Sequence, residues 1–394
     1  LPAPRRGTLR RLVFRGAEID HALLLWFPAP HSYTGEDVAE FHLHGGRAVR
    51  EALFAALLEQ GLRPAEPGEF SRRAVENGKL DLTRAEAIAD LVEAETPAQL
   101  RQALRQHDGA LADLYEGWRS RLIGGLGRAE AAIDFSDDGV GETEFAAARR
   151  AALEIIQEIQ EHMDDAGRGE SLREGLRLTI LGPPNAGKSS LINALARRDI
   201  AIVSDTPGTT RDVIETRLDL GGYLLLVADT AGVRDTDEPI EAEGVRRALS
   251  HAKGGMSLLV LDGSSDDPRA GLPADMPEPD LMIWNKADLG FRREGLSISL
   301  KTGEGVPMLL KMLQQKVQHK LEGDGAPSLT RPRHRHALRE ALTHLQHGMA
   351  APQDLPELLA EDLRLAMRAI GRITGAVDVE ELLDFVFRDF CIGK

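Results

Sequence analysis

The chain has 394 residues, of which 42% are apolar and 28% are charged, with a formal net charge of −15. This length predicts two or three domains, because a single hydrophobic core seldom grows beyond about 250–300 residues. The acidic balance argues against a general nucleic-acid coat, which carries a basic surplus, although it leaves room for a local basic patch.

Cys391 is the only cysteine of the chain. An intramolecular disulfide is therefore excluded, and we expect a reducing compartment, the cytoplasm. No uninterrupted apolar stretch reaches the roughly 20 residues that a membrane-spanning helix needs, so we expect no membrane association. The chain begins with Leu1 and not with Met, and we therefore expect that a further segment precedes it.

Residues 1–81 predict a small α/β domain. Short apolar runs such as HALLLWF (21–27) alternate there with loops rich in glycine and proline. In HLHGG (42–46), His42 and His44 alternate as on a strand. A metal site would want a third ligand at a recognisable spacing, and none follows, so we expect backbone packing around the two glycines.

The next two regions differ in the secondary structure that their hydrophobic patterns predict. Residues 82–172 predict helices, because Thr83 and Glu86 have the spacing of a capping box and apolar residues then recur with helical period. One break is expected, at DFSDDGVGETEF (134–145). Residues 173–328 alternate short apolar runs with helical stretches, which predicts a parallel sheet with crossover helices.

Residues 329–394 are helical again, after the linker EGDGAPSLTRP (322–332). The α/β unit is therefore expected to be inserted into one helical domain that is split in sequence. The stretch TRPRHRHALRE (330–340) is a candidate basic patch. A solvated helix start with spare charge is at least as consistent with the pattern.

The strongest signal is the sequence GPPNAGKS (182–189), which follows an apolar strand and opens a helix. This context is typical of a P-loop. Backbone N–H groups of such a loop converge on phosphate oxygens. Lys188 then reaches the β- and γ-phosphates, and the hydroxyl of Ser189 binds Mg²⁺.

Two further elements complete the phosphate site. PGTTRD (207–212) offers Thr210 as a second hydroxyl on Mg²⁺. DTAG (229–232) places Asp229 at a strand end, where it can hold Mg²⁺ through water, and the Gly232 N–H can contact the γ-phosphate.

The sequence NKAD (285–288) indicates guanine specificity. The Asp288 carboxylate can accept hydrogen bonds from the N1–H and amino group of guanine, a pair that adenine lacks. SLKTG (299–303) can add backbone N–H groups around the guanine oxygen. Four motifs in this order predict GTP binding.

Hydrolysis poses a separate question, because Val233 stands where Ras-type GTPases place a glutamine that orients the attacking water. Glu241 lies far enough into the second switch to orient a water instead. Asn185 offers an oxygen beside the phosphates that can ligate a monovalent cation. A bond from its side chain to its own backbone is an equally good interpretation.

Together, GPPNAGKSSLINAL, TPGTTRD, DTAG, NKAD, LTRAEAIADLVEA and the terminal FCIGK resemble the MnmE (TrmE) family of tRNA uridine-modification GTPases over essentially the whole chain. The resemblance implies a multidomain α/β plus α fold. Its parts would be a small α/β folate-binding-type domain that dimerises (1–81), a discontinuous helical domain (82–172 and 329–394) and an inserted Ras-like P-loop G domain (173–328).

The resemblance also implies an activity. It is that of a K⁺-stimulated GTPase whose G domains dimerise and which works as a homodimer with an FAD-containing, MnmG-like partner. The pair would form (carboxymethyl)aminomethyl at C5 of the wobble uridine in tRNA. The one-carbon donor would be a tetrahydrofolate derivative, 5,10-methylene- or 5-formyl-. The alternative is a regulatory or ribosome-assembly GTPase without modification chemistry, which the GTPase motifs alone do not exclude.

The resemblance assigns roles to individual residues. Glu241 would orient water through a bridging water. The Mg²⁺ ligands would be Ser189 and Thr210. The remaining sets follow as lists. K⁺ would be held by Asn185, Ser204, Thr206 and Thr209. GTP would be bound by Asn185, Ala186, Gly187, Lys188, Ser189, Ser190, Ser204, Thr209, Thr210, Asp229, Thr230, Ala231, Gly232, Asn285, Lys286, Asp288, Ser299, Leu300 and Lys301.

The folate contacts implied by the resemblance are Glu40, Lys79 and Lys394. The family's first strand, which carries an arginine at the folate pocket, has no counterpart in this sequence. Cys391 has two interpretations. A helix-start signal at Asp378 places it near a helix C-terminus, whose dipole disfavours a thiolate and predicts an inert thiol. The family implies instead that this cysteine is needed for tRNA modification.

Overall fold

The computed structural model describes residues 2–135, 140–198, 200–202, 215–228, 255–273, 276–323, 327–352 and 355–377, together with Leu383, Val386, Phe387 and Phe390. It divides into two compact units. Unit 1 comprises Leu1–Ala89, His107–Glu116 and Ile370–Lys394, and unit 2 comprises Asp90–Gln106 and Gly117–Ala369. The division at residues 81, 172 and 328 stays a prediction. Among the described residues, no helix combines the length and the apolarity of a membrane span.

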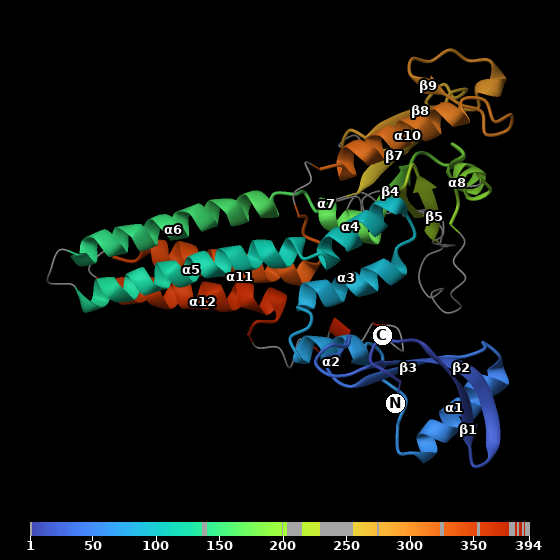
Figure 1. Ribbon diagram of the computed structural model, residues 1–394. Coiled ribbons are helices and arrows are strands. Elements are labelled where there is room, and N and C mark those ends of the chain that lie inside the picture. Colours follow the sequence, from blue (N-terminus) through green and yellow to red (C-terminus); the bar gives the residue numbers. More distant parts are fainter. Residues whose placement is uncertain are drawn as a thin grey trace. The chain divides into compact units, whose positions relative to one another are not determined.

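Unit 1 contains an antiparallel sheet of strands β1 (Thr8–Phe14), β2 (Ala17–Phe27) and β3 (Val38–His42), in that order. Helices α1 (Arg47–Glu59) and α2 (Glu69–Glu76) follow, and α3 (Leu82–Glu93) begins in this unit. The small α/β domain expected from the sequence is thus present (Figure 1).

The start of α3 corrects one prediction. Thr83 and Glu86 do not form a capping box, because the helix already begins at Leu82 and Thr83 therefore lies within its first turn and not at the N-cap. Asp81 caps the helix instead, and its Oδ1 accepts the backbone N–H of Arg84 at 3.0 Å. The spacing was misleading because a carboxylate two residues earlier offers the same acceptor to the first turn.

A small core connects α3 with the end of the chain. Leu82 and Ala85 pack there with Leu383, Phe387 and Phe390. The backbone of Gly68, at φ +67°, comes so close to the last two rings that a Cβ would lie 2.8 Å from the Cβ of Phe390. The residues just before Cys391 are therefore anchored inside unit 1.

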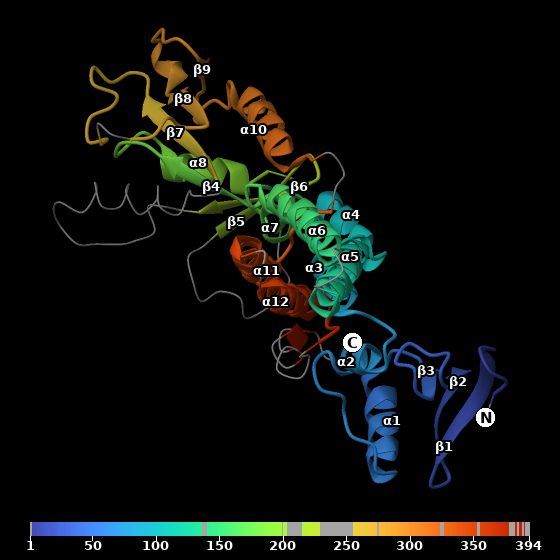
Figure 2. The same cartoon turned by 90° about the vertical axis from the view of Figure 1, so that its left-hand side faces the viewer.

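Helices that precede and follow the G-domain segment form a bundle, most of which belongs to unit 2. Helices α5 (Ala110–Asp134), α6 (Val140–Met163), α11 (Pro332–Ala350) and α12 (Pro356–Thr374) lie side by side in Figures 1 and 2. The Arg149 side chain on α6 donates to the backbone oxygens of Met349 and Ala351 near the end of α11. This confirms the split helical domain. The break between α5 and α6 is shorter than predicted, since α6 begins at Val140.

The G domain carries a sheet with strand order β5-β6-β4-β7-β8-β9. The strands are β4 (Leu176–Leu181), β5 (Glu215–Leu220), β6 (Tyr223–Ala228), β7 (Met256–Asp262), β8 (Leu281–Asn285) and β9 (Leu296–Ser297). All neighbours are parallel except β5, which pairs antiparallel with β6. The predicted parallel sheet is thus present, with one antiparallel strand added at its edge. Gly221 and Gly222, both with positive φ, form the tight turn that joins β5 to β6 in place of a crossover helix.

Helices α8 (Lys188–Ala196) and α10 (Val306–Leu321) contribute to the same apolar core as alternate residues of β4 and β7, such as Leu178, Ile180 and Val260. A separate cluster of Leu181, Leu259 and Leu261 lies on alternate positions of these strands. This burial on both faces explains the near-continuous apolar runs of the sequence. The parallel pairing of β4, β7 and β8 brings their carboxyl ends to one edge, where ligands bind in such sheets.

Helix α4 (Pro97–His107) borders the segments that lead into and out of the G domain. Three of its glutamines are spaced as neighbours on one helix face, and each bonds one of these segments. The bonds run from Gln99 Nε2 to Arg173 O (2.8 Å), from Gln102 Nε2 to Gly169 O (3.2 Å) and from Thr330 Oγ1 to Gln106 Oε1 (3.0 Å).

Asp90 on α3 joins the same two segments. Its Oδ1 accepts Arg173 Nε at 2.8 Å, from α7 (Arg168–Glu174), and Arg331 Nη2 at 2.7 Å. Arg335 pairs in the same way with Asp165, at 2.7 Å. Arg331 and Arg335 belong to the candidate basic patch at 330–340. Their charges are taken up by buried acids, which favours a structural role for this stretch over a nucleic-acid surface.

The β5–β6 hairpin also bonds the start of α4. The backbone N–H of Ala98 donates to Gly222 O at the hairpin turn, at 3.0 Å. Arg217 on β5 forms an ion pair with Glu95, at 3.0 Å. In sequence, this hairpin stands between the PGTTRD and DTAG motifs.

Candidate nucleotide-binding site

The loop between β4 and α8 has the backbone that a P-loop requires. Gly182, Asn185 and Gly187 have φ values of +150°, +59° and +101°. A Cβ on Gly182 would collide with the backbone oxygen of Val260, and one on Gly187 with Nδ2 of Asn285. Gly187 is the N-cap of α8, so the first N–H groups of the helix follow it directly. Such N–H groups have no partner within the helix and are suited to anions.

Lys188 and Ser189 occupy the first turn of α8, as predicted from the motif. The Lys188 ammonium donates to Gly182 O at 2.7 Å and to Pro183 O at 2.8 Å, and so lies against its own loop. Ser189 and Ser190 are exposed, and so is Asn185. Within the described residues the Asn185 side chain has no hydrogen-bond partner. The interpretation in which it bonds its own backbone therefore finds no support.

Asn285 connects three parts of the predicted site. It ends β8 and is buried. Its Nδ2 donates to Ala186 O of the P-loop at 2.9 Å, and its Oδ1 accepts the backbone N–H of Leu300 at 3.4 Å. The structure therefore brings residues 185–190, 285–288 and 299–301 together, although they are far apart in sequence.

Asp288 lies in the 3₁₀ turn η2 (Ala287–Leu289) after β8. Its Oδ1 accepts the hydroxyl of Ser299 at 2.7 Å. Ser299 is fully buried, and its Oγ also accepts the N–H of Thr302 at 3.2 Å. Lys301 Nζ is 3.9 Å from the other Asp288 oxygen and is mostly exposed. Ser299 therefore fixes the orientation of the carboxylate that was predicted to recognise guanine.

Lys286 has a partner that the sequence analysis missed. The residue has φ +68°, and its Nζ donates to Asp262 Oδ2 at 2.6 Å. Asp262 ends β7, and its Oδ1 accepts the backbone N–H and hydroxyl of Ser264. Burial raises the pKa of Asp262, but the bonds from Lys286 and Ser264 outweigh this effect and hold the pKa of the carboxyl group below its ordinary value. The sequence signal that could have identified Asp262 is an acidic residue at the end of an apolar strand, in VLDGSS (260–265).

The remaining predicted nucleotide, metal and catalytic residues lie outside the described residues. They are Ser204, Thr206, Thr209, Thr210, Asp229, Thr230, Ala231, Gly232, Glu241 and Cys391, together with the predicted folate contact Lys394. Their roles stay predictions.

The two described folate candidates belong to unit 1. Glu40 is exposed on β3 and its Oε2 is 3.1 Å from His42 Nε2, whereas His44 pairs with Asp20 at 2.7 Å. The histidines therefore have separate partners. Lys79 follows α2, and a Cβ on Gly35 would lie 3.1 Å from its Cε.

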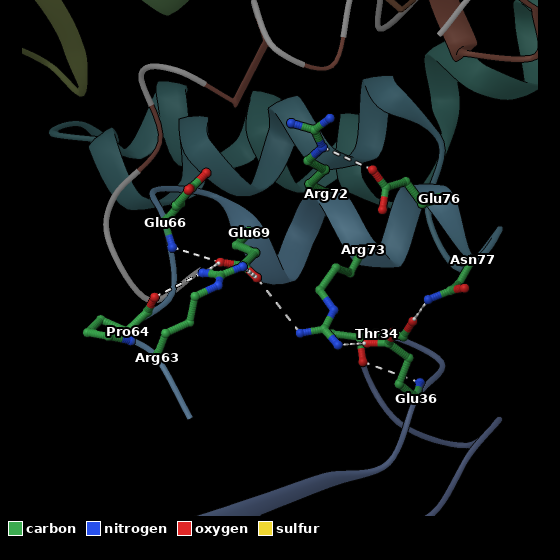
Figure 3. A network of polar contacts seen from close by, with 10 residues as sticks. All are labelled: Thr34, Glu36, Arg63, Pro64, Glu66, Glu69, Arg72, Arg73, Glu76 and Asn77. Carbon is green, nitrogen blue, oxygen red and sulfur yellow. Dashed lines mark hydrogen bonds and ion pairs between the residues drawn. The ribbon is translucent and has the colours of Figure 1, made fainter. Parts of the chain in front are cut away.

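The loop that contains Gly35 is tied to α2 by polar contacts (Figure 3). Asn77 Nδ2 donates to Thr34 O at 2.8 Å, and Arg73 pairs with Glu36 at 2.6 Å. At the other end of α2, Glu69 pairs with Arg63 at 2.7 Å. The environment of Lys79 is thus an ordered loop on a helix and not a free tail.

Family models and curated relatives that match this chain point to the same family over nearly its whole length. The family model described as "MnmE helical domain" matches residues 82–391, and that described as "GTP-binding protein TrmE N-terminus" matches residues 2–79. A tRNA modification GTPase MnmE of Rhodospirillum rubrum is 54% identical over 390 residues, which cover 96% of this chain and 85% of the relative. That of Paramagnetospirillum magneticum is 53% identical over 408 residues, with 100% and 91% covered.

Among solved structures, the G domain of the T. maritima FeoB iron transporter is 20% identical, and the alignment covers 37% of this chain and 99% of that one, with a TM-score of 0.25.

Proposed function

Because the chain belongs to the MnmE family of tRNA modification GTPases, we propose that it hydrolyses GTP to support the modification of tRNA wobble uridines in the cytoplasm. It is a GTP hydrolase. Its partner would be an FAD-containing, MnmG-like protein, and the product (carboxymethyl)aminomethyl at C5 of the uridine. The one-carbon unit would come from 5,10-methylene- or 5-formyl-tetrahydrofolate.

The observation that carries the GTPase part is the junction at Asn285. One buried side chain bonds the P-loop through Ala186 and the loop at Leu300. It thereby fixes the distance between the predicted phosphate site and Asp288. A guanine nucleotide, with its base at Asp288 and its phosphates at the P-loop, would reach both places.

The described residues fit the ions that the proposal requires. Ser189 presents an exposed hydroxyl at the helix N-terminus, as a ligand for Mg²⁺ must, and Thr210 would be the second. Asn185 is exposed, and within the described residues its carbonyl oxygen is unbonded. It suits K⁺, with Ser204, Thr206 and Thr209 as further ligands. The cation would supply positive charge for the transition state, and Glu241 would orient the water.

The proposal predicts a cation requirement. GTP turnover should be at least about tenfold slower in Na⁺ than in K⁺, because one missing charge-stabilising group has effects of this order or larger. Asn185→Ala should remove the difference between the two salts without unfolding the protein, since its side chain is exposed. The measurement is the steady-state rate at equal ionic strength. Equal wild-type rates in the two salts would contradict the prediction.

Unit 1 would provide the folate site and the homodimer contact. Glu40 and Lys79 are held on β3 and beside an ordered loop, and Lys394 would reach them from the tail. Phe387 and Phe390, just before that tail, are anchored on α3 in the same unit. This supports a site in which the end of the chain takes part.

The decisive experiment uses Cys391→Ser. Modified wobble uridine, measured after complementation of a strain that lacks the protein, should fall by about tenfold or more, as for loss of a group at a reacting centre. K⁺-stimulated GTP turnover and the unfolding temperature should stay at wild-type values, because the phosphate and guanine residues lie elsewhere. Normal modification with the serine variant would mean that the thiol is dispensable and that Cys391 is an inert cysteine. Normal wobble uridines in the strain that lacks the protein would instead favour a regulatory or ribosome-assembly GTPase.

A further inference from the structure

Asp262 stands at the carboxyl end of β7, directly opposite Asn285 in the register of the sheet. We propose that Asp262 is a positioning residue for guanine-nucleotide binding, which acts by holding the ammonium of Lys286. The inference rests on the proposed function, since it concerns the base end of the same site.

The ends of β7 and β8 are bonded to each other at this point. The N–H of Gly263 donates to Asn285 O at 3.1 Å. The next residue of β8 is Lys286, whose left-handed backbone turns the chain out of the strand. The left-handed conformation is unfavourable for a residue with a Cβ such as lysine. Its ammonium then meets Asp262 Oδ2 at 2.6 Å, so the turn and the ion pair fix both ends of the side chain.

Asp262 is itself held in one orientation. The N–H of Ser264 donates to Oδ1 at 3.0 Å and its hydroxyl at 2.6 Å, which leaves Oδ2 for the lysine. The Asp262 side chain is 22% exposed and that of Lys286 35%. This is an ion pair between partly buried groups with a fixed acceptor, and not a loose surface contact.

The consequence for the nucleotide concerns the methylene stem. A lysine whose charged head is bound elsewhere covers apolar surface with its stem. Here the stem starts between Asn285, which touches the P-loop, and Asp288, which is positioned to bond the edge of the base. The stem is thus the part of Lys286 that is available for the face of the purine. Without Asp262 the side chain would be free to rotate, and binding would have to immobilise it.

The test compares Asp262→Asn with a matched control in the same domain. Asp280 precedes β8, accepts the N–H and hydroxyl of Ser257, and pairs with Lys320 at 3.1 Å. Like Asp262, it therefore bonds one serine and one lysine, but at the opposite end of β8. Asp262→Asn should raise the dissociation constant of fluorescently labelled GDP about five- to tenfold, the effect of one side chain immobilised on binding. Asp280→Asn should not change it.

Three readouts separate positioning from a general loss of structure. The turnover number at saturating GTP should be unchanged in Asp262→Asn, while KM rises. GDP and IDP should lose affinity by the same factor, because the 2-amino group is read by Asp288 and not by the lysine stem. Lys286→Met keeps a stem without an ammonium, and adding Asp262→Asn to it should not lower the GDP affinity further. Asp262→Glu, which keeps a carboxylate for the ammonium, should bind GDP more tightly than Asp262→Asn.

Unchanged GDP affinity in Asp262→Asn would overturn the inference, and so would an effect equal to that of Asp280→Asn. Additive effects of the Asp262 and Lys286 variants would also overturn it, since Asp262 would then not act through Lys286. None of these outcomes touches the proposed function. That would fail at this site only if Asp288 variants, measured beside them, bound GTP as wild type does.

Discussion

Asp288→Asn is expected to bind GTP about 10²–10⁴-fold more weakly than the wild-type protein. The carboxylate would accept two hydrogen bonds from guanine, and each bond to a charged group contributes about 1.5–3 kcal/mol. An amide retains one acceptor and presents a donor in place of the other. Xanthine has a carbonyl oxygen where guanine has its amino group, so the variant should prefer xanthosine triphosphate. Competition titrations with the two nucleotides measure the switch.

The structure indicates that this variant will fold. Ser299 donates to Asp288 Oδ1, and the amide oxygen of Asn can accept the same hydroxyl. The loop at 299–303 should therefore keep its conformation, and the unfolding temperature without nucleotide serves as the control. Wild-type affinity for GTP in the variant would show that the base is read elsewhere.

Gly187→Ala is expected to lower nucleotide affinity about 10²–10³-fold. Alanine in a left-handed conformation costs about 1–2 kcal/mol, and Gly187 has φ +101°. The added Cβ would also collide with Asn285 Nδ2, whose bond to Ala186 O joins the P-loop to the base site. Loss of such a buried bond costs about 1–3 kcal/mol more. Calorimetric titration with GDP measures the combined effect.

The matched control is Gly271→Ala. Gly271 also has a positive φ, +83°, but no atom lies within 4 Å of the position where its Cβ would be. It carries the backbone strain of the Gly187 variant without the collision. Its nucleotide affinity should equal that of the wild type, with a lower unfolding temperature as the only effect. If both variants lose affinity alike, then strain in the domain and not the junction at Asn285 is responsible.

The features that the sequence predicts best are those with a local physical cause. The glycine spacing of the P-loop follows from the positive φ values of Gly182 and Gly187, which favour glycine at both positions. The split helical domain follows from helical periodicity on either side of an alternating region, and it is confirmed by contacts such as Arg149 with Met349. Both patterns can be read without knowledge of the tertiary structure.

The features that the sequence did not predict depend on tertiary neighbours. Asp81 and Thr83 are both good caps, and only the packing of Leu82 into the core decides between them. Asp262 carries no motif, since its role depends on a lysine 24 residues later that the pairing of β7 with β8 brings beside it. The antiparallel direction of β5 likewise depends on the turn at Gly221 and Gly222, which hydrophobic periodicity does not predict.

Helix α4 bears every glutamine bond that joins the helical region to the segments flanking the G domain, among those described above, and its first turn also bonds the hairpin at Gly222. One face of this helix therefore holds the segment that enters the G domain, through Gln99 and Gln102, and the segment that leaves it, through Gln106. A substitution on this face would loosen both connections at once, so α4 is a common anchor of the inserted domain.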